Sequence, residues 1–103
     1  MKPEYYNLVG KEAIPVPFEL MRRPNKSKGE GIIKQETVGD WWISTVFIGF
    51  EHDPYDDGPP QIFETLVQGP DLRDNEYYYY AAWAEAEEGH RLMVAEFRNR
   101  VCT

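Results

Sequence analysis

The segment from Trp41 to His52, WWISTVFIGFEH, limits the fold more than any other stretch of this 103-residue chain. Its even-numbered and its odd-numbered positions are both largely apolar, and β-branched and aromatic residues dominate it. Such residues favour β structure, and a strand that is apolar on both sides is typical of the middle of a sheet. We therefore predict a central strand that ends at His52 and is covered on both sides over at least part of its length.

The segments on either side of this strand indicate further strands. Residues 31–37, GIIKQET, can form one, and the following Val-Gly-Asp supplies residues suited to reversing the chain. The segments QIFETLVQG and EYYYYA come next with the same two-residue period, and the loop GPDLRDN separates them. We predict an antiparallel β meander of about four to five strands over residues 31–80.

Residues 82–100 change to helical spacing, with an apolar stripe at steps of three and four. The stripe comprises Trp83, Ala86, His90, Met93 or Val94, Phe97 and Val101. Laying this amphipathic helix across one face of the sheet is the simplest way to bury the stripe, and Gly89 would allow a close approach. The expected fold class is α+β, as a single domain of residues 1–103. Residues 1–30 are less regular, with a hairpin predicted around Gly10.

The charge of the chain changes sign along its length. The formal net charge is −7; residues 1–36 carry seven Lys or Arg against five Glu, whereas residues 37–103 carry four Arg against thirteen Asp or Glu. An acidic body repels phosphate backbones, which argues against nucleic acid as a partner unless a local basic cluster acts alone. That cluster, Arg22, Arg23, Lys26 and Lys28, lies in a Pro/Gly/Ser-rich stretch that we interpret as a solvated loop. Carboxylates gathered on one side would support mimicry of a nucleic acid towards a basic partner, and scattered carboxylates would exclude it.

Cysteine usage and hydropathy bear on the compartment. The single cysteine, Cys102, excludes an intramolecular disulfide framework and a cysteine-based zinc site. The N-terminal residues lack an apolar signal core, and Trp41–Phe50, the longest largely apolar run, is too short to cross a bilayer. We expect a soluble cytoplasmic protein that makes no membrane contact, and we predict no metal and no cofactor.

The stretch EHDPYDDGPP, Glu51–Pro60, gathers one His and four carboxylates into ten residues. Counted from Asp53, it matches the calcium-binding loop of an EF-hand at four positions. Tyr55 occupies a ligand position, however, two prolines distort the middle of the loop, and the flanking segments are strands. Because Pro, Asp and Gly are turn formers, we interpret Asp53–Pro60 as the tip of a hairpin.

Three residues from different elements form a candidate polar cluster: His52, Glu64 and His90. Two imidazoles and a carboxylate are the ligands of a catalytic zinc site with one open position, and they can also act as general acid and base. The alternative is that His90 is a core histidine hydrogen-bonded to Glu64 or to a hydroxyl. The sequence has no nucleophile elbow, phosphate-binding glycine loop or H-E-x-x-H helix, so an enzyme hypothesis depends on this cluster.

The tyrosine run Tyr77, Tyr78, Tyr79 and Tyr80, with the nearby Tyr and Trp residues, exceeds what one small core can hold. If two of these side chains face the helix, the other two face outward. Exposed aromatics suit a protein-binding patch, a self-association interface or a stacking surface for a small ligand. The alternative is a second covered sheet face, packed by the N-terminal segment. The candidate interaction surface combines the four tyrosines with Asp53, Asp56 and Asp57.

The string WISTVFIGFEHDPYDDGPPQIFETLVQG, followed by YYYYAAWAEAEEGH, resembles a family of small uncharacterised proteins encoded by bacteriophages and actinobacterial genomes. The shared pattern is an STV strand, a His, a Gly/Pro-rich loop, an FET strand and a helix containing GH. It covers about residues 38–95 and is carried by Ser44, Thr45, Val46, His52, Pro59, Pro60, Phe63, Glu64, Thr65, Gly89 and His90. This chain departs from it at Ala81 and Ala82, where a capping Ser or Thr is expected, and in its more acidic loop. The resemblance implies a viral or prophage setting and no particular activity.

These observations lead us to expect a small non-enzymatic phage-type accessory protein. It would bind a host or defence protein through an acidic, aromatic surface, and its charge would steer a basic partner towards it. One alternative is a small metal-dependent or acid/base enzyme that uses His52, Glu64 and His90. Another is a small-ligand binder lined by Tyr and Trp, which requires a concave pocket. A homo-oligomer is a further expectation for the exposed aromatic residues.

Overall fold

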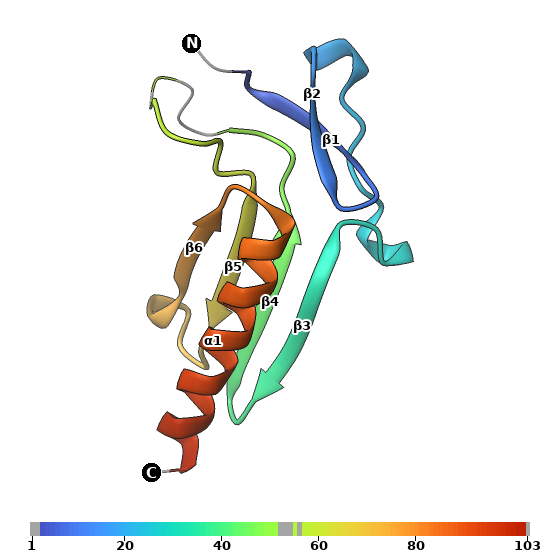
Figure 1. The fold of residues 1–103 in the computed structure, drawn as a ribbon. Helices are drawn as coiled ribbons and strands as arrows, with labels where there is room; N and C mark the ends of the chain where they lie inside the picture. The colour runs from blue at the N-terminus through green and yellow to red at the C-terminus, as the bar shows by residue number, and fades with distance from the viewer. Residues whose placement is uncertain (1–2, 52–54, 56, 103) are drawn as a thin grey trace.

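The computed structural model describes residues 3–51, 55 and 57–102 (Figure 1). It has an α+β fold, with a four-stranded antiparallel sheet, a two-stranded sheet and one C-terminal helix that packs on the larger sheet. The predicted fold class is therefore confirmed. In the described part of the chain, no helix is long and apolar enough to cross a membrane.

The larger sheet is a meander in which each strand pairs with the next one along the chain. Its strands, in order across the sheet, are β3 (Ile32–Val38), β4 (Trp41–Phe47), β5 (Phe63–Gln68) and β6 (Glu76–Tyr80). The turn between β3 and β4 uses Gly39 at φ +60°, a conformation that glycine adopts without steric cost. Within the residues that the structure describes, the outer strands, β3 and β6, each have a sheet neighbour on one side only.

The N-terminal segment forms the predicted hairpin, with Gly10 at φ +64° in its turn. It lies at one end of the larger sheet (Figure 1) and contributes Tyr6 to the core. Its strands are β1 (Tyr5–Val9) and β2 (Glu12–Val16). Three short 3-10 helices complete the chain: η1 (Phe18–Leu20), η2 (Lys26–Lys28) and η3 (Leu72–Asp74).

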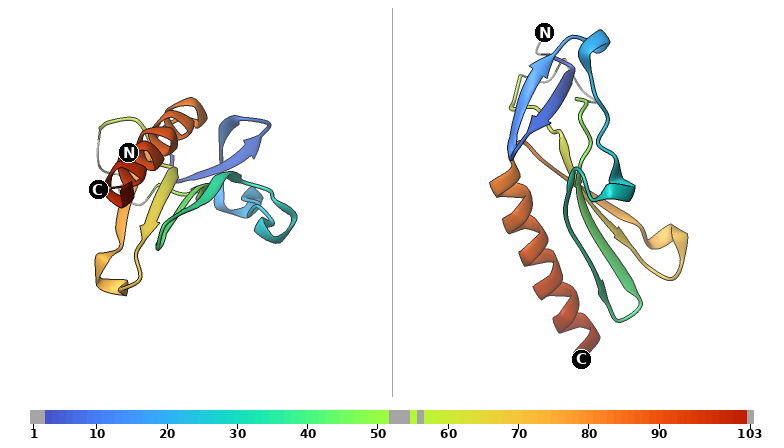
Figure 2. Two further views of the ribbon diagram at one scale, coloured as in Figure 1. Left: turned by 90° about the horizontal axis from the view of Figure 1, so that it is seen from below. Right: turned by 90° about the vertical axis from the view of Figure 1, so that its right-hand side faces the viewer.

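Helix α1 (Trp83–Cys102) lies across one face of the larger sheet, as the two views of Figure 2 show. The buried residues Ala86, His90, Val94 and Phe97 follow the predicted helical stripe. Gly89 makes the close approach possible, because a Cβ atom at this position would clash with the ring of Tyr80. The close approach and the stripe from Ala86 to Phe97 therefore agree with the sequence-based prediction, whereas Val101, predicted as the last member of the stripe, is 48% exposed.

The core beneath α1 consists of two apolar clusters with a polar row between them. One cluster contains Tyr6, Phe47, Ile62, Phe63 and Ala86, and the other contains Val38, Ile43, Val67, Val94 and Phe97. Between them, Thr45 of β4 is paired with Thr65 of β5, and both are fully buried. The polar row thus crosses the middle of the covered face, where each hydroxyl requires a hydrogen-bond partner.

The strand predicted for residues 41–52 is shorter than expected. Strand β4 ends at Phe47, and Gly49 at φ +81° redirects the chain so that Phe50 pairs with Tyr5 in an isolated bridge. The chain therefore leaves the sheet to meet the N-terminal hairpin, and His52 lies outside the described residues.

β4 is a central strand as predicted, but in the described part of the chain only one of its faces is covered by another layer (Figure 2). On the other face Trp42 remains 37% exposed, whereas Val46 is 8% exposed. The register pairs Val46 with Ile32 on one side and with Glu64 on the other.

Candidate functional site

A line of hydrogen bonds crosses the covered face of the sheet and reaches the edge strand β3. The hydroxyls of Thr45 and Thr65 are 2.5 Å apart, and the Thr45 hydroxyl lies 2.7 Å from Nδ1 of His90. On the other side of the imidazole ring, Nε2 lies 2.9 Å from a carboxylate oxygen of Glu36. Four residues from three strands and the helix are thereby joined through His90, which is 2% exposed.

The chemistry of the groups fixes the direction of each bond. An ionised Glu36 can only accept, so Nε2 of His90 carries the proton and donates it. Burial lowers the pKa of His90 even though Glu36 acts in the opposite direction, so the ring is neutral near pH 7. Nδ1 of a neutral ring must then accept from the Thr45 hydroxyl, and Thr45 accepts from Thr65.

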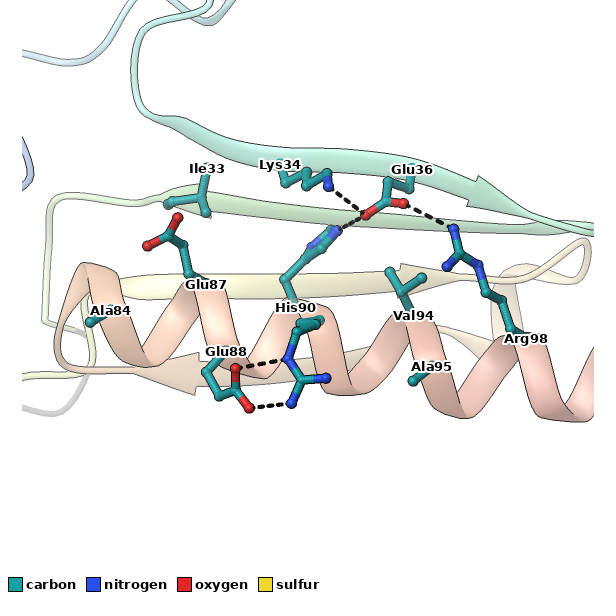
Figure 3. A pocket seen from close by; sticks show the side chains of 11 residues that line it. Ile33, Lys34, Glu36, Ala84, Glu87, Glu88, His90, Val94, Ala95 and Arg98 are labelled. Carbon is teal, nitrogen blue, oxygen red and sulfur yellow. Dashed lines mark hydrogen bonds and ion pairs between the residues drawn. The ribbon is translucent and has the colours of Figure 1, made fainter.

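Glu36 connects this line of hydrogen bonds to two charged side chains near the protein surface. Its side chain is 21% exposed and lies 3.6 Å from Nζ of Lys34 and 3.6 Å from the guanidinium of Arg98 (Figure 3). Burial by itself would raise the pKa of Glu36, but the hydrogen bond from His90 and the charges of Lys34 and Arg98 together hold the pKa below its usual value.

A groove of about 640 Å³ runs between α1 and β3 above this carboxylate (Figure 3). His90, Val94 and Glu36 lie along it, and Ile33 and Lys34 line it from the strand. The helix contributes Ala84, Glu87, Glu88, Arg91, Ala95 and Arg98, which recur at steps of three and four along one stripe. The groove therefore has a wall from a helix and a wall from the edge of a sheet.

The hydroxyl, imidazole and carboxylate of this line have the composition of a hydrolase triad, but their arrangement argues against that chemistry. A nucleophile must be reached by its substrate, and Thr45 has no exposed surface. The groove reaches His90 and Glu36, while the Thr45 hydroxyl is hydrogen-bonded to Thr65 within the core. We interpret the line as an internal clamp that holds α1 in register over β3, β4 and β5.

The structure does not bring Glu64 and His90 together. Glu64 is paired with Val46 on one side and Tyr79 on the other, and it precedes Thr65, which points towards the helix. Successive strand residues point to opposite faces, so Glu64 lies on the face away from α1. The prediction that Glu64 and His90 belong to one polar cluster is therefore wrong. The third predicted member, His52, lies outside the described residues. The alternative of a core histidine bonded to a hydroxyl is what the structure shows for His90, with Thr45 as the partner.

No group of three His, Cys, Asp or Glu residues within residues 3–51, 55 and 57–102 is arranged to hold a metal ion. Glu36, the carboxylate that His90 contacts, was not singled out from the sequence. One signal for it exists: the tight turn at Gly39 sets Glu36 opposite Ile43, which puts it on the same face as Thr45. The predicted stripe already directs His90 towards the sheet, but which strand residues lie beneath it depends on how the helix docks, for which the sequence carries no comparable signal.

The acidic connection between β4 and β5 contains one residue with a structural role that the sequence did not reveal. Glu51 is 5% exposed, and its carboxylate accepts a hydrogen bond of 2.7 Å from the main-chain N–H of Gln61. Its own N–H donates to the carbonyl of Glu4 at 2.7 Å. Glu51 therefore ties the base of the connection to the N-terminal hairpin. Asp57 of the predicted surface is exposed, whereas Asp53 and Asp56 lie outside the described residues.

The four tyrosines of β6 are divided between the two faces of the sheet. Tyr78 and Tyr80 pair with Thr65 and Phe63 on the helix side, whereas Tyr77 and Tyr79 lie on the opposite face. There, Tyr77 is 53% exposed and Tyr79 is 38% exposed. The N-terminal hairpin does not cover this face, so the alternative of a second covered face is not what the structure shows.

We call this surface the open face and define it by Trp42, Val46, Glu64, Leu66, Tyr77 and Tyr79. Glu64 is the one charged residue among the residues of β3 to β6 that the register places there. Burial, the Glu64 charge and the hydrogen bond to Glu64 all raise the pKa of Tyr79. The phenol therefore stays protonated and donates to this carboxylate, and the aromatic surface carries little free charge.

Four other carboxylates of the described residues take part in ion pairs on different elements. Glu36 lies in the groove, Glu88 and Glu96 form ion pairs along α1, and Asp71 pairs with Arg73 beyond β5.

Comparison with protein-family models, with curated proteins and with solved structures found no match for this chain.

Proposed function

We propose that this chain is a small non-enzymatic accessory protein of a phage or prophage. It acts in the cytoplasm of the host cell by binding a host or defence protein through the open face. The sequence resemblance supports the viral setting. The single observation that supports binding is the exposure of Trp42, Tyr77 and Tyr79 on one sheet face that no other element of the described chain covers.

The chemistry of the open face suits a protein partner. Trp and Tyr supply large contact areas, and they are enriched among the residues that dominate binding energy at protein interfaces. Glu64 already accepts a hydrogen bond from Tyr79, so covering this face leaves no unpaired carboxylate at its centre. The acidic groups elsewhere on the molecule can steer a basic partner without having to be desolvated at the contact.

The two rival functions have less support from the same geometry. An enzyme that uses Glu64 and His90 together would need these residues on one face, and the sheet separates them. A small ligand could stack on one ring, but the exposed rings are spread over β4 and β6, where a protein surface makes more contact than a small molecule does.

The proposal can be tested by affinity capture from an actinobacterial host lysate at physiological salt. Three baits are immobilised: the wild-type chain, the Trp42→Thr/Tyr77→Thr double variant, and Leu92→Ser as a matched control. Leu92 is 54% exposed on the helix, away from the open face, so its substitution removes a comparable exposed apolar side chain. Mass spectrometry of the retained proteins is the readout.

We expect a host protein that the wild-type chain and Leu92→Ser retain and that the double variant loses. The purified partner should then bind the double variant at least about tenfold more weakly, the loss typical of removing interface residues worth about 1.4 kcal/mol or more. Absence of any retained host protein, or equal retention by all three baits, would overturn the proposal.

A further inference from the structure

The groove between α1 and β3 borders an unpaired strand edge. Among the described residues, strand β3 pairs with β4 alone, so the N–H and C=O groups of alternate residues on its outer side have no strand partner there. A β-bulge between Ile32 and Lys34 interrupts the start of the strand, which leaves Lys34–Val38 as the regular part of the edge. An added strand of about five residues would match this length.

The groove offers places for the side chains of such an added strand. Its volume of about 640 Å³ lies within the range of ligand-binding clefts. Small and apolar residues, Ala84, Ala95, Val94 and Ile33, alternate with charged residues along its walls (Figure 3). A strand edge beside a helix-walled groove is the geometry by which extended peptides are bound through strand addition.

The charges around Glu36 favour one kind of peptide side chain. Lys34 and Arg98 are both about two-thirds exposed, and each lies 3.6 Å from the same Glu36 carboxylate. The neighbouring His90 is neutral, so Glu36 itself faces two cations, Lys34 and Arg98. Further along the groove, Arg91 forms an ion pair with Glu88, and Glu87 lies beside Ile33 (Figure 3). A carboxylate brought to Lys34 and Arg98 would balance the second cation.

We propose that the α1/β3 groove binds an extended acidic peptide segment of a partner protein. The segment adds to the edge of β3 between Lys34 and Val38 and places one carboxylate between Lys34 and Arg98. This site is separate from the open face, since it lies on the helix side of the sheet, and it does not depend on the open face being an interface.

The test uses three capped synthetic heptapeptides, TVTDTVT, TVTSTVT and TVTKTVT, titrated into the ¹⁵N-labelled full chain and followed by amide chemical shifts. As strands, they present Val, the central residue and Val on one face. We expect saturable shifts on β3 and on the groove stripe of α1. Binding of the Asp peptide should be at least about threefold tighter than binding of the Ser peptide, and the Lys peptide should bind most weakly.

Two further arms separate strand addition from simple charge attraction. The Lys34→Glu/Arg98→Glu variant should reverse the order of affinity for the Asp and Lys peptides, whereas Arg73→Glu, which changes an exposed arginine outside the groove, should preserve it.

Two N-methylated Asp peptides, blocked at odd or at even residues, should differ in affinity, because one of them loses the N–H groups that face β3. Equal binding of both methylated peptides, shifts confined to the open face, or no shifts at millimolar peptide would overturn the proposal. The Trp42→Thr/Tyr77→Thr variant should bind the Asp peptide as the wild-type chain does, so failure of the open-face proposal would leave this result intact.

Discussion

The two faces of the larger sheet are built from alternate residues of the same strands, yet they differ in how far their side chains are buried and in whether their polar groups need partners inside the molecule. On the helix side, Phe47, Phe63 and Phe97 are fully buried, and every polar group in the row at Thr45 has a partner. On the open face, the aromatic residues keep a third to a half of their surface exposed. The covered face must therefore be complete to fold, whereas the open face can vary without loss of the fold.

The difference shows where stability and recognition lie in this chain. The covered face holds one line of polar groups that is satisfied inside the molecule, from Thr65 to Glu36. The open face holds polar tips, such as the Tyr77 hydroxyl, on large apolar bodies, which is the combination found at protein interfaces. Because successive residues of a strand point to opposite faces, residues that stabilise the fold alternate along each strand with residues that are available for recognition.

The largest expected effect contrasts a buried and an exposed apolar residue of the same helix. Phe97→Ala should lower the free energy of unfolding by about 3–5 kcal/mol, because it leaves a cavity beside Val94 and against the ring of Trp41. Leu92→Ala, at a site 54% exposed, should change it by no more than about 0.5 kcal/mol. Urea denaturation measures both, and similar losses in the two variants would contradict the assignment of the covered face.

The second prediction concerns the hydrogen-bonded line. His90→Leu should cost about 2 kcal/mol, because it removes the acceptor of the Thr45 hydroxyl and the hydrogen bond that Glu36 accepts from Nε2. Adding Thr45→Val should cost less in this background than in the wild-type chain, since the unpaired hydroxyl is removed with it. A double-mutant cycle by chemical denaturation gives the coupling energy, and strictly additive losses would show that the two residues act independently.

The third prediction is a pH dependence of stability that originates at His90. Its pKa in the folded protein lies below the usual 6.5, so on acidification the unfolded chain binds the proton first. The contribution of His90 to the free energy of unfolding is complete above about pH 6.5 and is lost as the pH falls below that value. Glu36, whose pKa is lowered from 4.5, adds a further loss of stability in more acidic solution.

Thermal unfolding between pH 7.5 and 5 measures this effect. His90→Gln should flatten the dependence across pH 6.5, while His52→Gln, the control at the second histidine of the chain, should retain it. If His52→Gln abolished the dependence instead, the burial argument for His90 would fail.

The smallest expected effect belongs to the open face. The Trp42→Thr/Tyr77→Thr variant should unfold within about 1 kcal/mol of the wild-type chain, because both side chains are substantially exposed and Thr suits a strand. Far-UV circular dichroism and urea denaturation check this. A loss comparable to that of Phe97→Ala would mean that the open face is part of the folding core.

Much of the fold could be predicted from local patterns, and the polar site could not. Two-residue alternation placed β3 to β6, and the stripe from Ala86 to Phe97 placed the helix with its buried side. The end of β4 was placed too late, because Gly49 redirects the chain through a conformation that apolar periodicity does not register. Glu64 was predicted as the partner of His90 because it is charged. Its position in β5, next to Thr65, places it on the face away from the helix and excludes this contact.

The sequence by itself determined which segments extend, which segment coils, and which side of the helix is buried, because pleat and helix period repeat the side-chain direction at fixed spacing. Only the tertiary structure decided that His90 lies between Thr45 and Glu36, because strand register and the height of the helix over the sheet depend on packing between distant residues. The same packing leaves the face with Trp42 and Tyr77 uncovered and opens a groove beside the edge of β3, and these are the two surfaces on which the proposed binding rests.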